Sequence, residues 1–129
     1  MKNKALIIVS VALLTLLASL ACMLFSPSGV SLQFEPDRLP NAQAGVAYET
    51  QIHVTHNRTP VGDFAISKGA LPAGLELKKV AGVEDTARIS GMPQEAGTFT
   101  FTVSVWCYGT NVSGQTGEKE YSLVVTKRP

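Results

Sequence analysis

Between positions 98 and 105 apolar and polar residues alternate without a break, and this alternation constrains the fold more than any other feature of the sequence. The residues between the apolar positions are threonines and a serine; the apolar positions are Phe99, Phe101, Val103 and Val105. Successive side chains of an extended strand point to opposite faces, so the stretch predicts a β-strand with one buried face. The same pattern recurs, less strictly, at residues 48–55 and 121–125.

Four shorter stretches, each bounded by Gly, Pro, Asn or Asp, predict further strands at residues 30–34, 63–67, 75–79 and 86–90. No stretch after Phe25 has the three-four spacing of an amphipathic helix over several turns. Without helices, a sheet with one apolar face must bury that face against a second sheet. We therefore expect an all-β fold, an immunoglobulin-like β-sandwich of about seven strands.

The first 25 residues differ in composition from the rest of the chain. Lys2 and Lys4 precede an apolar run from Ala5 to Phe25 that contains no charged residue. This pattern predicts an N-terminal apolar helix that serves as a signal sequence or membrane anchor, over residues 1–25. Residues 26–29, Ser-Pro-Ser-Gly, would form a linker, and residues 30–129 the folded domain.

Three fates of the apolar segment stay open. Small residues at Ser19 and Ala21 suit cleavage after Ala21 by signal peptidase. Residues 19–22 resemble a bacterial lipobox, which implies lipidation of Cys22, although Ser19 stands where such motifs usually have leucine. The run is also long enough to span a bilayer uncleaved. The last two fates both tether the domain, on the periplasmic or extracellular side of the cell envelope.

Charge argues against nucleic acid as a partner. Of eleven basic residues only Lys2 and Lys4 precede Cys22, which leaves nine basic and ten acidic residues beyond it. A phosphate-binding surface needs concentrated cations, and no cluster here exceeds two. The membrane would be contacted through the N-terminal segment alone.

The sequence carries no catalytic motif for a nucleophile elbow, zinc protease, phosphate loop or dinucleotide site, so we expect no enzyme, no catalytic residue and no cofactor. His53 and His56 are three residues apart, which on a strand places them on opposite faces. They would share no metal ion, and we expect no metal site.

The segment from Tyr108 to Gly117 predicts a polar loop between the last two strands. Trp106, Tyr108 and Asn111 are the candidate partner-binding residues, because end loops of sandwiches bind partners and exposed aromatics are enriched at interfaces. A purely structural alternative is that Trp106 covers the sheet and Tyr108 starts a turn. Cys107 is expected to be a buried, unpaired thiol; a disulfide with Cys22 is the alternative if Cys22 is unmodified.

Three motifs follow one another in the second half of the chain: Leu71 to Leu77 reads LPAGLEL, Ile89 to Pro93 reads ISGMP, and Ala96 to Val103 reads AGTFTFTV. This order resembles the bacterial immunoglobulin-like family He-PIG, which is related to dystroglycan-type cadherin-like domains. Upstream, Leu39 to Tyr48 is similar to the family's approach to its second strand, so the resemblance covers about residues 30 to 126.

The resemblance implies a non-enzymatic binding or structural module with a protein partner. Because members usually occur as repeats and this domain is single, we expect an accessory subunit of a bacterial envelope or surface assembly. The alternative is a small periplasmic protein inhibitor of an enzyme. Related domains often continue with a calcium-binding Asp where this chain has Trp106 and Cys107, and the remaining carboxylates are scattered, which argues against calcium.

Overall fold

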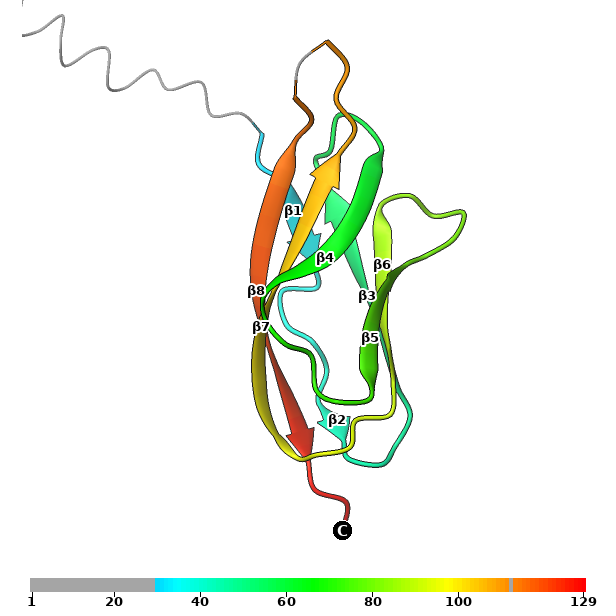
Figure 1. Cartoon of the computed structure of the whole chain (residues 1–129), viewed down its shortest axis with the longest axis vertical. Helices are drawn as coiled ribbons and strands as arrows, with labels where there is room; N and C mark the ends of the chain where they lie inside the picture. Colours follow the sequence, from blue (N-terminus) through cyan, green and yellow to red (C-terminus); the bar gives the residue numbers. More distant parts are fainter. Residues whose placement is uncertain (1–29, 112) are drawn as a thin grey trace, which may run out of the picture.

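Two four-stranded sheets lie face to face in the computed structural model, which describes residues 30–111 and 113–129 (Figure 1). The first sheet has the order β1-β3-β6-β5 and the second β2-β8-β7-β4. All strand pairs are antiparallel except β2 with β8. The strands are β1 (Gln33–Glu35), β2 (Ala42–Gln43), β3 (Tyr48–Thr55), β4 (Val61–Gly69), β5 (Leu75–Lys79), β6 (Thr86–Gly91), β7 (Gly97–Cys107) and β8 (Thr116–Thr126).

The predicted all-β sandwich is confirmed for the described residues, with differences at element ends. The first strand begins at Gln33 rather than residue 30, and β8 begins at Thr116, inside the predicted loop. Strand β2 was not predicted, because two residues are too few to show an alternating pattern. The predicted apolar helix of residues 1–25 and the linker of residues 26–29 lie outside the described residues. Among the described residues no helix is long and apolar enough to cross a membrane.

The core consists of the side chains that alternate inward from both sheets. Ile52 on β3 and Ile89 on β6 meet Val103 on β7 and Leu123 on β8, and all four side chains are fully buried. These are the apolar positions of the sequence pattern, and the intervening residues of β8 face solvent. Burial of the alternating set therefore fixes the register of both sheets.

The chain crosses from the first sheet to the second between β1 and β2, and two tyrosines hold the crossing segment. The hydroxyl of Tyr48 donates to the carbonyl oxygen of Pro40 at 2.9 Å, and that of Tyr121 donates to the carbonyl oxygen of Pro36 at 3.0 Å. Burial, with a smaller contribution from the carboxylate of Asp37, raises the pKa of Tyr121 to about 12. The neutral phenol thus serves as a buried donor that fixes the strand switch.

The glycines of the LPAGLEL and ISGMP motifs let two backbone segments approach closely. Gly74 and Gly91 have φ angles of 93° and 139°. A Cβ atom on Gly91 would lie 2.0 Å from the carbonyl oxygen of Gly74, which accepts a hydrogen bond from Met92 N–H at 3.0 Å. No side chain fits there, so these motif residues are architectural.

Candidate interaction surface: an aromatic pair at one end of the sandwich

Trp106 and Tyr108 form an exposed aromatic pair where β7 leaves the second sheet. Trp106 points away from the core, as its place in the alternation predicts, and is 47% exposed; Tyr108 is 53% exposed. Their ring centroids are 5.1 Å apart with an interplanar angle of 77°, an edge-to-face contact. This geometry is favourable for aromatic rings, so each ring restricts the other while both remain accessible.

The Trp106 ring rests on the backbone of Gly62. A Cβ atom at Gly62 would lie 2.2 Å from the ring, so only glycine allows the indole to lie against β4 here. Gly62 is the extra residue of a bulge, because Val61 pairs with Cys107 and Asp63 with Trp106. From β5, Lys79 Nζ donates to the carbonyl oxygens of Val61 and Gly62 at 2.6 and 3.2 Å. The seat of the tryptophan is therefore fixed from both sheets.

Tyr108 is held by its backbone rather than by its side chain. Its N–H donates to the carbonyl oxygen of Pro60 at 3.0 Å, and its carbonyl oxygen accepts from the Thr59 hydroxyl at 2.6 Å. Both partners belong to the loop between β3 and β4. The ring is thus presented from an anchored backbone, and little conformational freedom remains to be lost when a partner binds.

Gln115 joins three segments beside the pair. Its side-chain carbonyl accepts from the N–H of Arg58 at 2.6 Å, and its amide donates to the carbonyl oxygens of His56 at 3.2 Å and Val30 at 3.0 Å. Val30 is the first described residue, so the chain enters the domain at the same end as the aromatic pair. The C-terminus lies at the opposite end (Figure 1).

A small depression adjoins Tyr108 on this end of the domain. It has a volume of about 240 Å³ and is lined by residues of the β3–β4 and β7–β8 loops: Arg58, Thr59, Tyr108, Gly109, Thr110, Ser113, Gly114 and Gln115. Arg58 is the one charged residue of the lining, and the others are Tyr108 and small or uncharged polar residues that expose mainly apolar atoms. This is the chemistry of a small contact surface and offers no nucleophile with an adjacent base.

The structure brings two of the three predicted binding residues together. Trp106 and Tyr108 are in contact, whereas Asn111 is exposed on the same loop and no hydrogen bond among the described residues joins it to the pair. Sequence reasoning missed Gly62, Lys79 and Gln115. A glycine within an apolar strand pattern was the available signal for Gly62, since it often marks a bulge or a close backbone approach.

The histidines and the cysteine have structural positions. His53 Nδ1 lies 2.7 Å from the hydroxyl of Thr86, across the β3–β6 pair. His56 follows the end of β3, outside the predicted strand of residues 48–55, and has a φ angle of 63°. Cys107 is buried and has no cysteine partner among residues 30–111 and 113–129, and burial raises the pKa of its thiol. Cys22 lies outside the described residues.

Within that same part of the chain, no group of three or more histidine, cysteine, aspartate or glutamate side chains could hold a metal ion.

The strand order defines the class of protein. When the two-residue strand β2 is left out, seven strands remain. The first, second, fifth and fourth of them (β1, β3, β6, β5) form one sheet, and the third, sixth and seventh (β4, β7, β8) form the other. This is the strand order of the immunoglobulin-like sandwich. The family model "Putative Ig domain" (He_PIG) matches residues 28–126, so the chain belongs to this family. Domains of this kind are generally non-catalytic.

Solved structures share the fold at low sequence identity. The SrpA adhesin from Streptococcus sanguinis matches with a TM-score of 0.57 and 13% identity, over 79% of this chain and 60% of the adhesin chain. The endo-fucoidan hydrolase MfFcnA4 of glycoside hydrolase family 107 matches with a TM-score of 0.58 and 14% identity, over 81% of this chain and 14% of that enzyme. A second such hydrolase, MfFcnA9, matches with a TM-score of 0.50 and 21% identity, over 71% and 15%.

This chain thus spans about a seventh of the two hydrolases and 60% of the adhesin chain. A search of curated proteins found no match.

Proposed function

We propose that this chain is a membrane-tethered, extracytoplasmic binding module, an accessory subunit of a bacterial envelope or surface assembly, and that the Trp106–Tyr108 pair contacts its protein partner. The observation that carries the proposal is the pair itself. Two large aromatic side chains stay about half exposed while a glycine seat and an anchored loop fix their positions.

A side chain that only covers the sheet would not need this arrangement. Tryptophan and tyrosine dominate the binding energy of many interfaces, and pre-ordered side chains lose less entropy on binding. The structural likeness to the SrpA adhesin supports a role in contact rather than catalysis. The hydrolases are matched over only a small part of their chains, so their activity gives no support for an enzyme here.

The entry point of the chain adds a constraint on the partner. If residues 1–25 tether the protein, only residues 26–29 separate the tether from Val30, and four residues span at most about 14 Å. The amide of Gln115 binds Val30 beside the β3–β4 loop. The aromatic end would therefore face the membrane, and the partner would be a membrane protein or a subunit close to the bilayer.

Co-purification from gently solubilised membranes tests this proposal. A tagged full-length chain should retain a stoichiometric envelope protein, and the double change of Trp106→Ala with Tyr108→Ala should lose it while the tagged chain stays folded and membrane-associated. A matched control is Met92→Ala, which removes an exposed apolar side chain from the opposite end.

Retention of the partner by the double variant would contradict the assignment of the aromatic pair. Recovery of the wild-type chain in the soluble fraction, without partner, would contradict the tethered module.

A further inference from the structure

Strand β8 has a long free edge. On one side it pairs with β7 along residues 116–125, but on the other side β2 reaches only Val125 and Thr126. The backbone of residues 116–123 therefore has no neighbouring strand on that side. An unpaired edge of this length is a template for another strand unless it is covered.

The register shows which backbone groups point to the free edge. Cys107 N–H donates to the carbonyl oxygen of Gln115 at 2.8 Å, so this pair is hydrogen-bonded. In an antiparallel ladder such pairs alternate with non-bonded ones, whose N–H and C=O groups point away from the partner strand. Counting along the uninterrupted register, Glu118, Glu120 and Ser122 present both groups to the free edge. Among the described residues no hydrogen bond engages these groups.

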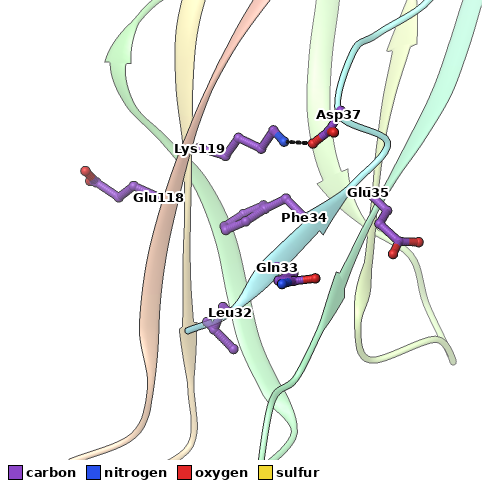
Figure 2. A pocket seen from close by; sticks show the side chains of 7 residues that line it. All are labelled: Leu32, Gln33, Phe34, Glu35, Asp37, Glu118 and Lys119. Carbon is purple, nitrogen blue, oxygen red and sulfur yellow. Dashed lines mark hydrogen bonds and ion pairs between the residues drawn. The ribbon is translucent and has the colours of Figure 1, made fainter. Parts of the chain in front are cut away.

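A groove runs along this edge. Its first part, about 580 Å³, lies between β1 and the start of β8, where the buried Phe34 forms the floor and Lys119 pairs with Asp37 (Figure 2). Its second part, about 440 Å³, continues past Asp37 along Glu120, Ser122 and the β1–β2 segment. Residues 118–124 cover about 20 Å of strand, enough for a peptide of six or seven residues.

The charges of the groove identify the strand that fits. Four carboxylates line it, and the cations of the lining are Arg38 and Lys119, so the lining carries two net negative charges; the carboxylates are Glu35, Asp37, Glu118 and Glu120. From β4, Lys68 Nζ lies 3.9 Å from Glu118 Oε2 in an exposed ion pair that an incoming cation would have to replace, whereas no ion pair among the described residues engages Glu120. In a second copy of β8, antiparallel self-pairing about residue 119 would set Glu118 opposite Glu120, and pairing about residue 120 would set Glu120 opposite itself; like charges directly opposite destabilise a sheet. Only a shifted register about residue 121, which uses less of the free edge, avoids both. A strand with basic residues at alternate positions would face both glutamates instead.

We propose that the β8 edge binds an extended basic segment of a partner protein by β-strand addition. The backbone groups of Glu118, Glu120 and Ser122 hydrogen-bond the added strand, and the two glutamates pair with its lysine or arginine side chains. This site adjoins the aromatic pair, because Trp106 and Glu118 line the same depression. It goes beyond the proposed function, since it names the β8 edge as a second surface and the chemistry of what it takes.

Amide hydrogen exchange on the full-length chain in non-ionic detergent tests the proposal. The probe is a capped synthetic peptide of about nine alternating lysine and threonine residues, long enough to cover the free edge. At saturation the amides of Glu118, Glu120 and Ser122 should exchange at least about tenfold more slowly. The amides of Lys119 and Tyr121, which already bond to β7, should not change.

Two variants and a second peptide sharpen the test. Ser122→Pro removes one outward N–H without breaking a β7–β8 bond and should weaken binding about tenfold. Combined Glu118→Lys and Glu120→Lys should reverse the preference from the lysine peptide to one with glutamate in its place. Glu84→Lys, in the β5–β6 loop, makes the same charge change away from the edge and should leave the preference unchanged.

Absence of binding, binding without protection of the three amides, or equal binding of the glutamate peptide would overturn the proposal. Protection that appears without peptide and grows with protein concentration would overturn the assigned occupant, because it would mean self-pairing. Tyr108→Ala changes the member of the aromatic pair that does not line the depression shared with Glu118, and it should leave peptide binding intact. Failure of the aromatic contact and failure of this site are therefore distinguishable.

Discussion

Replacing Gly62 with alanine should displace the Trp106 ring. The new Cβ atom would lie 2.2 Å from the indole, whereas nonbonded carbons are stable at 3.5–4.0 Å, so the ring must move by about 1.5 Å. The backbone of Gly62 cannot retreat easily, since Lys79 binds its carbonyl oxygen and that of Val61. The side chain is therefore expected to yield, toward solvent.

The energetic cost follows from the contact that the ring gives up. Losing about 60 Å² of apolar contact costs about 1.5 kcal/mol at 25 cal/mol per Å². The reduced backbone freedom of the unfolded alanine variant returns about 0.5 kcal/mol. The net loss of about 1 kcal/mol should lower the melting temperature by about 4–8 °C for a domain of this size.

Tryptophan fluorescence provides the assay, because Trp106 is the single tryptophan in the chain. Emission of Gly62→Ala should shift to longer wavelength, and thermal unfolding followed by circular dichroism should give the stability change. In a Trp106→Ala background the glycine substitution should cost nothing, which a double-mutant cycle measures. Unchanged emission and stability in the single variant, or the same cost in both backgrounds, would refute the glycine seat.

Three further predictions concern the core and its edges. Burial raises the pKa of Tyr121 to about 12 from about 10, so the folded state favours the neutral phenol. The contribution of this phenol to the free energy of unfolding should be fully present below pH 10 and should be lost as the pH rises through 12. Urea unfolding at alkaline pH should show a smaller decline for Tyr121→Phe, and an unchanged decline would contradict this. At neutral pH the same substitution should lower the free energy of unfolding by about 1 kcal/mol, because the hydrogen bond to Pro36 is lost. Lys79→Met should lower the free energy of unfolding in urea by about 1–2 kcal/mol, because two carbonyl oxygens lose a charged donor. Equal stability of the variant and the wild type would contradict this, since it would mean that water replaces the lysine. In a Cys22→Ser chain, Cys107 should react with a thiol reagent roughly tenfold more slowly, or slower still, when folded than in denaturant; equal rates would contradict its burial.

Much of the fold could be predicted because burial and sequence alternation have the same period. The inward positions of β7 are the apolar positions of residues 98–105. The close backbone approach at Gly74 and Gly91, in the motifs LPAGLEL and ISGMP, is seen only in the assembled sheet. Strand β2 could not be predicted. Its two residues form a strand only because β8 lies beside them, and that neighbour is far away in the sequence.

The candidate site could be predicted in part. Alternation alone puts Trp106 outside the core, but its contact with Gly62 depends on a bulge in a strand about forty residues earlier in the chain. The free edge of β8 depends on strand order, which no local pattern encodes. Side-chain identity therefore indicated the aromatic pair, and only the assembled sheets reveal what holds the pair and which backbone groups stay open.

The most direct test of whether the aromatic end of a tethered module contacts a protein partner is photocrosslinking in intact cells. A photoreactive phenylalanine analogue replaces Tyr108 in one chain and Met92, exposed at the opposite end, in another. We predict one discrete heavier species from position 108 and none from position 92. Equal crosslinking at both positions, or no protein adduct at position 108, would contradict the claim.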